Sequence, residues 1–269
     1  MMTDIIKIRN VYDEGADEEY LRLIKSPLHE AEWTLTTELI DEYISAGDKV
    51  LDIGAGPGRY SEYLALKGCQ VGLVDISKES LNRFHERVDE SVLKQVIFSR
   101  ESSATDLTWV EAASFDCVLA MGPLYHLVSE PERTKVLDGC RRVLRPDGIL
   151  VAAFISPYQA LAHLFQNPDD APDIETVKKL LDDGITYHRG MEQWRCWPQT
   201  AQLMIKSMGF DILRTRNLEG IGCFLGRHHS ECISTQEGKK ALFNMLRLTC
   251  EIPDLLGATW HFVCVAKRN

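Results

Sequence analysis

The sequence predicts an α/β fold built on a mainly parallel sheet, and two observations support this prediction. From residue 50 onward, short apolar runs alternate with segments whose apolar residues recur at helical spacing, which is typical of strands joined by helices. Residues 50–61 read VLDIGAGPGRYS, which is a strand, a turn with a glycine at every second position, and a helix. The length of 269 residues suits one large domain, residues 1–269, with inserted segments.

The elements follow in chain order. Residues 1–46 form a helical lead-in, because apolar residues recur at helical spacing up to the stop signal Gly47. Ser77 is placed to cap the helix after the second strand, and Ser129 with Glu132 forms a capping box for the helix after the fourth. The predicted strands are residues 50–53, 70–74, 96–98, 115–120, 149–154, 209–215 and 259–266.

Two segments interrupt this rhythm. Residues 156–199 are predicted to be a mostly helical insertion that covers the site as a substrate cap, and their Tyr187, His188, Trp194 and Trp197 are either substrate contacts or the insertion's own small core. Residues 217–250 form a second insertion, which contains Arg-His-His at residues 227–229. The spacing of this group does not match a structural metal site, so we predict no metal.

The glycine turn predicts a nucleotide-like ligand, and its spacing indicates which one. A dinucleotide fingerprint would place its third glycine where Arg59 follows Gly58, so binding of NAD is not expected. Instead, Asp52 precedes the first glycine, and its carboxylate suits an ammonium group. Asp75 ends the next apolar run, where ribose hydroxyls are held in such folds. An ammonium group and a ribose together predict S-adenosylmethionine.

At these residues the sequence resembles the class I S-adenosylmethionine-dependent methyltransferases. The resemblance covers nearly the whole chain and rests on YDE, DIGAGPGRY, VDIS, FDCVLAMGPLYHL, RRVLRPDGIL and LLGATWHFVCVAKR. It implies a Rossmann-like, seven-stranded, mostly parallel sheet whose last strand, residues 259–266, is antiparallel. Family members usually carry an acid for the adenine where this chain has Ser103 and Ala104. Either these two residues or Asp106 take that place here.

The cofactor-binding residues that the motifs and the resemblance imply lie after four successive strands. They are Asp52, Gly54, Ala55, Gly56, Gly58, Arg59, Asp75, Ile76, Ser103, Ala104, Asp106, Met121 and Gly122.

The candidate catalytic residues are His126 and Tyr125, which leave the carboxyl end of the fourth strand, where open α/β sheets bind ligands. A neutral histidine can accept a proton near pH 7, so His126 is either the proton acceptor or a structural residue at the next helix. Tyr125 either bonds the acceptor or packs. In the resembling family the lead-in packs over the cofactor, so Tyr12 either approaches the ligand or anchors the lead-in.

Composition narrows the function classes. The net charge of −10 opposes a nucleic-acid partner and favours a small-molecule substrate. The scattered cysteines read as reduced thiols, and neither an apolar leader nor a spanning segment is found, so we expect a cytoplasmic monomer or homodimer without a membrane partner. Methyl transfer to a small molecule is the predicted function. The alternatives are a methyltransferase for tRNA or protein, and a non-catalytic cofactor-binding protein.

Overall fold

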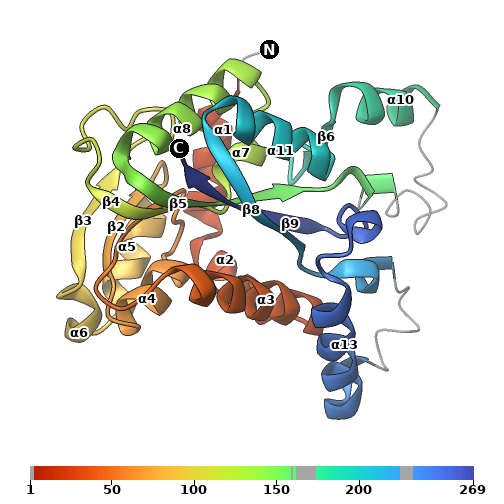
Figure 1. Cartoon of the computed structure of the whole chain (residues 1–269), viewed down its shortest axis with the longest axis horizontal. Coiled ribbons are helices and arrows are strands. Elements are labelled where there is room, and N and C mark those ends of the chain that lie inside the picture. Colours follow the sequence, from red (N-terminus) through yellow and green to blue (C-terminus); the bar gives the residue numbers. More distant parts are fainter. Residues whose placement is uncertain (1–2, 159, 162–173, 225–232) are drawn as a thin grey trace.

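The computed structural model describes residues 3–158, 160–161, 174–224 and 233–269, and within them seven strands form one sheet (Figure 1). The strand order is β3-β2-β1-β4-β5-β9-β8, and β9 runs antiparallel to both β5 and β8. The predicted fold class is therefore confirmed. The strands are β1 Lys49–Ile53, β2 Gln70–Asp75, β3 Val96–Glu101, β4 Phe115–Ala120, β5 Leu144–Ile155, β8 Phe210–Asn217 and β9 His261–Arg268.

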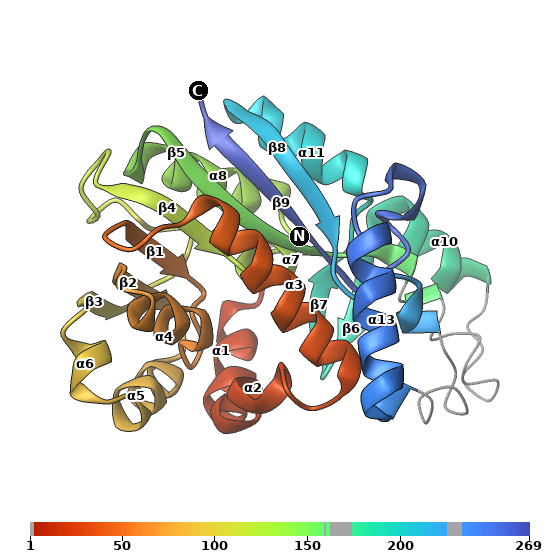
Figure 2. The ribbon, with the colours of Figure 1, turned by 60° about the horizontal axis from the view of Figure 1, so that its bottom comes forward.

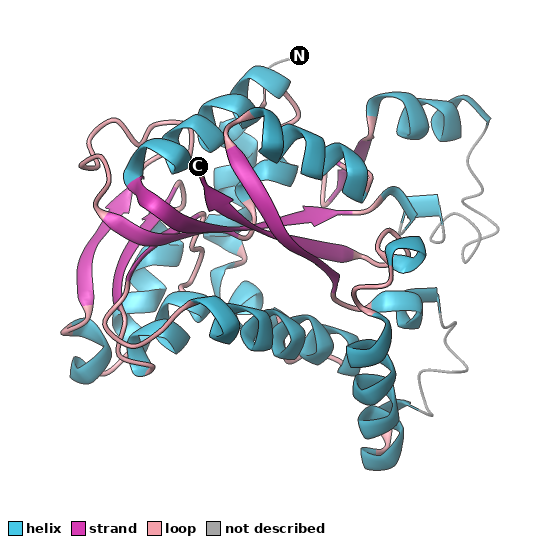
Figure 3. Cartoon of the chain, in the orientation of Figure 1, coloured by secondary structure: helices cyan, strands magenta, loops and turns pink. Residues whose placement is uncertain are grey.

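Helices cover both faces of the sheet (Figures 2 and 3), because side chains along each buried strand alternate between two cores. In β1, Val50 joins the core under one set of helices, whereas Leu51 and Ile53 join the opposite core. The first core is covered by α3 Pro27–Tyr43, α4 Arg59–Leu66, α5 Lys78–Arg87 and α13 Gln236–Thr249, and the second by α8 Glu130–Val143 and α11 Pro198–Ser207.

The lead-in is helical, as predicted, and two of its helices, α1 Ile5–Glu14 and α2 Ala16–Arg22, pack beside α5. The capping box was wrong. Ser129 is the N-cap of α8 but makes no side-chain capping bond, and Glu132 instead accepts hydrogen bonds from the backbone N–H and the hydroxyl of Thr3 at 3.2 and 2.6 Å. Thr3, which is distant in sequence, is thus the partner of Glu132 in place of Ser129. The predicted cap Ser77 does accept a bond from the Ser80 N–H.

The insertion at residues 156–199 combines helix and strand in its described part. It contains α10 Ile174–Asp183, but also a hairpin of β6 Ile185–His188 and β7 Met191–Trp194. Arg189 and Gly190 connect the two strands with φ of 51° and 77°. Two consecutive positive φ values match the twist of a two-residue hairpin turn. Arginine is uncommon in that conformation, so Arg189 is not a residue that would predict such a turn.

The second insertion, residues 217–250, contains the 3-10 helix η2 Gly220–Phe224 and the helix α13, which packs against α3. The histidine pair at residues 228–229 lies outside the described residues. The cysteines in the described part of the chain are buried free thiols. Among the described residues, no helix is both long enough and apolar enough to cross a bilayer.

Candidate active site

The glycine turn lies at the carboxyl end of β1 and forms one wall of a pocket. The N–H groups of Gly54 and Ala55 both donate to the Val74 carbonyl, which fixes the turn against β2. A Cβ on Gly54 would lie 2.6 Å from a side-chain carbon of Pro123, so glycine permits this close approach. At Gly56, with φ of 54°, a Cβ would meet nothing within 4 Å. The backbone there is open to a ligand.

Asp52 is buried in the pocket wall, with 2% of its surface exposed. Its Oδ2 accepts a 2.7 Å hydrogen bond from the Ser61 hydroxyl on α4. Burial, which disfavours the charged form, raises the pKa of this carboxyl from 3.8 to about 7, although the Ser61 bond opposes the shift. A cationic ligand group beside Asp52 would reverse this shift.

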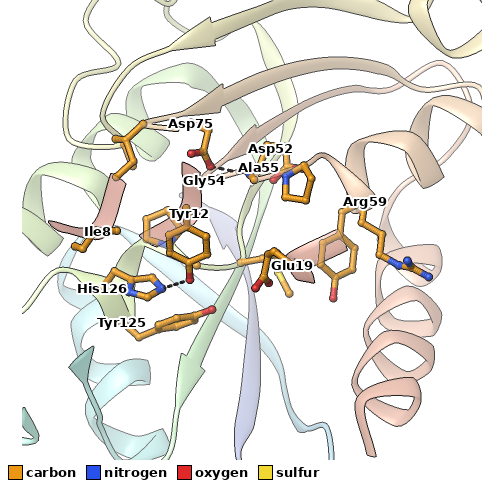
Figure 4. A pocket seen from close by; sticks show the side chains of 18 of the residues that line it. Ile8, Tyr12, Glu19, Asp52, Gly54, Ala55, Arg59, Asp75, Tyr125 and His126 are labelled. Carbon is orange, nitrogen blue, oxygen red and sulfur yellow. Dashed lines mark hydrogen bonds between the residues drawn. The ribbon is translucent and has the colours of Figure 1, made fainter. Parts of the chain in front are cut away.

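Asp75 also lines the pocket and lies beside the glycine turn (Figure 4). Its Oδ2 accepts from the Gly56 N–H and its Oδ1 from the Ser77 N–H, both at 2.7 Å. Burial raises the pKa of Asp75 from 3.8 to about 6, against the effect of these bonds. Since each carboxylate oxygen has more than one lone pair, both can still accept ligand hydroxyls.

The residues after β3 include Ser103, Ala104 and Asp106, the alternatives predicted for contact with the adenine. Ser103 and Ala104 line the pocket, together with Ser102 and, after β2, Ile76. Asp106 does not line it. Its exposed carboxylate accepts bonds from the Thr108 N–H and hydroxyl, which lower its pKa.

The turn after β4 brings Met121 and Gly122 to the pocket, followed by the short helix α7 Pro123–His126. His126 Nε2 and the Tyr12 hydroxyl share a 2.7 Å hydrogen bond (Figure 4), while His126 Nδ1 has no partner among the described residues. Burial, with a smaller contribution from the charge of His188, lowers the pKa of His126 to about 3. The imidazole is therefore neutral near pH 7.

The N-terminal helices supply a charged wall that the sequence analysis missed. Arg22 forms a two-pronged pair with Glu32 at 2.6 and 2.8 Å, and its Nε donates to Glu19 at 2.7 Å. All three line the pocket. Burial alone would raise the pKa of Glu32, but Arg22 lowers it to about 2. Only the three-residue spacing of Glu19 and Arg22 on one helix face could have suggested part of this wall.

Comparisons with known proteins identify the family. Residues 50–148 match the family described as a methyltransferase domain. The ubiquinone biosynthesis O-methyltransferase of Xanthomonas axonopodis pv. citri (strain 306) is 37% identical over 62% of this chain and 69% of that relative. The chain belongs to the class I S-adenosylmethionine-dependent methyltransferases. It spans about half the length of other relatives of the same description, such as that of Psychrobacter cryohalolentis, which is 32% identical over 52% of this chain and 51% of its own.

Solved structures match the fold of this methyltransferase over most of its length. The magnesium protoporphyrin IX methyltransferase of Synechocystis PCC 6803, solved with bound SAH, is 14% identical with a TM-score of 0.61, covering 99% of this chain and 100% of its own. The 1,6-didemethyltoxoflavin-N1-methyltransferase of Burkholderia thailandensis is 15% identical with a TM-score of 0.57, covering 97% and 87%. At these identities the likeness concerns the fold.

Two residues predicted to contact the cofactor have other surroundings in the methyltransferase. Gly58 faces the Phe84 ring, leaves no room for a Cβ, and is not part of the pocket lining. Arg59 lines the pocket, but its guanidinium donates to the Tyr20 carbonyl and packs over the rings of Tyr20 and Trp33, away from the other pocket side chains (Figure 4).

The candidate substrate contacts of the insertion are outside this pocket lining, and they are Tyr187, His188, Trp194 and Trp197. Trp194 is buried in the second core, beneath the guanidinium of Arg133 at 3.6 Å. Tyr187 is exposed, donates to Glu192 and lines a separate pocket. His188 is exposed on the hairpin. By contrast, Tyr12 and both predicted catalytic residues do line the main pocket.

One group of possible metal ligands occurs in the described part of the methyltransferase. Oxygen and nitrogen atoms of Glu32, Glu219 and His261 lie within 4.8 Å of one another. His261 Nδ1 contacts Glu219 at 2.7 Å, and Glu32 already pairs with Arg22. Although burial lowers the pKa of His261, the two carboxylates outweigh it and raise that pKa. With an arginine at this position the group is an ion-pair network, and we assign no metal to it.

Proposed function

We propose that this protein transfers a methyl group from S-adenosylmethionine to a small-molecule acceptor. The observation that carries the proposal is a pocket with two kinds of wall. Asp52, Gly56 and Asp75 form one wall at the strand ends, and Tyr12 with His126 stands opposite. Pockets that place a few polar groups among apolar and aromatic side chains are typical sites for small molecules, and this lining suits a nucleoside donor together with a small acceptor.

The strand-end wall fits the methyl donor. Asp75 would accept the ribose hydroxyls, Asp52 would face the ammonium group, and the open backbone at Gly56 would admit the ligand. Ser103 and Ala104 would border the adenine. When bound, S-adenosylmethionine supplies a methyl group on a positively charged sulfur. The chain's own task is then alignment, because reacting atoms must be held about 3 to 3.5 Å apart.

The opposite wall would orient the acceptor. A histidine whose conjugate acid has a pKa of about 3 is a weak base at neutral pH. This supports a role for His126 in orienting the acceptor through Tyr12 over a role as proton acceptor. Tyr125, the neighbour of His126 on α7, would contact the acceptor directly.

We also propose the insertion at residues 156–199 as the substrate cap. Its strand β7 packs against α7, so closure of the hairpin would act on the helix that carries His126. The aromatic residues of the hairpin would then affect the acceptor through α7, since they do not line the pocket themselves.

The experiment that tests the function is a metabolite-library screen with methyl-labelled S-adenosylmethionine. We expect label to appear in a small molecule and S-adenosylhomocysteine to accumulate with it. Calorimetry on the purified chain should show binding of both cofactor forms and none of NAD. Binding of NAD without the methyl donor contradicts the proposal.

A further inference from the structure

The pocket carries more acidic than basic groups on the acceptor side. Glu19, Arg22 and Glu32 line this side. The single guanidinium of Arg22 is divided between the two carboxylates. The other arginine of the lining, Arg59, directs its charge to Tyr20 and Trp33 instead. Behind Glu32, His261 pairs with Glu219, which adds one basic and one acidic group. The acceptor side therefore keeps an excess of acidic over basic groups, which repels anions and attracts cations.

Glu19 is the carboxylate through which this charge is offered to a ligand. Its side chain is 24% exposed, and only its Oε1 is bonded, to Arg22 Nε, within the described residues. Figure 4 shows its carboxylate inside the pocket, beside Tyr12 and Tyr125. The charge of Glu19 also affects the pKa values of both tyrosines. After the effect of burial, Glu19 is among the charges that raise the pKa of Tyr12 and of Tyr125.

A second, independent feature points to a ligand at the same place. Tyr125 is 9% exposed, and its hydroxyl forms no hydrogen bond with any described residue. A Cβ on Gly122 would lie 3.8 Å from this hydroxyl, so the oxygen stands at the end of β4 inside the pocket. Within the described residues this hydroxyl is left free to bond a polar group of a ligand in the pocket. Tyr12, Tyr60 and Tyr125 add aromatic faces, which attract ammonium groups.

We propose that the methyl acceptor carries a protonated amine and that Glu19 binds this amine between the tyrosine rings. The proposal rests on the proposed function and specifies its substrate class. A carboxylate bonded to an ammonium group gives a charge-assisted contact, whereas an acidic substrate would meet Glu19 directly. Such contacts are worth roughly ten- to a hundredfold in the dissociation constant.

Three probes that share one ring test the charge preference. The protein, saturated with S-adenosylhomocysteine, is titrated with tyramine, para-ethylphenol and para-hydroxyphenylpropanoate, which are cationic, neutral and anionic. We expect tyramine to bind at least about tenfold more tightly than the other two. Equal binding, preference for the anion, or no binding of any probe overturns the proposal. If S-adenosylhomocysteine itself does not bind, the proposed function fails instead.

Two variants locate the preference. Glu19→Gln should remove the tenfold preference, whereas Glu19→Asp should retain it. Glu18→Gln is the matched control, because Glu18 is adjacent, carries the same charge, and is 81% exposed beside Arg189. Thermal unfolding verifies that each variant folds. The affinities of Glu19→Gln for S-adenosylmethionine and S-adenosylhomocysteine should both be unchanged. Weaker binding of the charged sulfonium form alone would assign Glu19 to the cofactor and overturn the proposal.

Discussion

Replacing Asp52 with asparagine should make the free protein more stable at alkaline pH. The rise in the pKa of this carboxyl from 3.8 to about 7 on burial corresponds to about 4 kcal/mol, at roughly 1.36 kcal/mol per pH unit. This is the cost of holding a charged carboxylate in the folded chain above neutral pH. An asparagine still accepts the Ser61 bond but never ionises. It also buries an amide, so we expect a gain of about 1 to 4 kcal/mol.

The sign follows from proton linkage. Between the unfolded pKa of 3.8 and the folded pKa of about 7, folded Asp52 binds more protons than unfolded Asp52. The free energy of unfolding therefore falls as pH rises through this window. The asparagine variant lacks this loss, so its advantage should be largest near pH 8 and should shrink toward about pH 4.

The assay is thermal unfolding of both proteins without ligand across this pH range, followed by calorimetry with S-adenosylhomocysteine. The variant should be more stable but bind the ligand more weakly, because it no longer offers a carboxylate to the ammonium group. The variant Ser61→Ala is the control, because it removes the hydrogen bond to Asp52 but leaves the carboxyl group in place. A variant that is less stable at every pH, or whose stability difference does not change with pH, refutes the reasoning.

Three further outcomes are expected. Asp75→Ala should weaken S-adenosylhomocysteine binding by roughly one to two decades in calorimetry with the fold retained, and an unchanged constant would place the ribose elsewhere. His126→Ala should lower kcat with little change in cofactor affinity. The wild-type pH–rate profile should show no step near pH 6.5, since burial lowers the pKa of His126 to about 3. A step there that is absent in the variant would identify His126 as the proton acceptor. Hydrogen exchange in the β6–β7 hairpin should slow when cofactor and acceptor bind, and protection equal to that of β4 in the free protein would exclude a cap.

The strand ends could be predicted from sequence because their signals are local. The order of Asp52, the glycines and Asp75 sits within two adjacent βα units, and apolar runs place each residue at the correct end of the sheet. The charged wall had no such signal, since it joins α2 to α3 and to His261 near the other end of the chain. A charged residue is predicted to lie on the surface unless the partner that would let it be buried is known.

The failed capping box has the same cause as the missed wall. Serine followed three residues later by glutamate is a local pattern, but the Thr3 side chain and N–H compete for that glutamate from far away in sequence. Asp106 shows the opposite case, because its carboxylate bonds the nearby Thr108 and it does not line the pocket. Local rules predict elements well and the competition for polar partners poorly.

The position of β9 constrains the order in which the sheet can fold. This strand lies between β5 and β8 in the sheet, although it is the last of the described strands in sequence, so β8 cannot join the sheet until β9 is made. His261, at the start of β9, also completes the ion pairs with Glu219 and Glu32 behind the pocket. Chains that emerge from the ribosome fold from the N-terminus, and such long-range pairing is slow. A nascent or truncated chain lacking β9 therefore exposes an unpaired β5 edge, which makes it a target for chaperones and proteases.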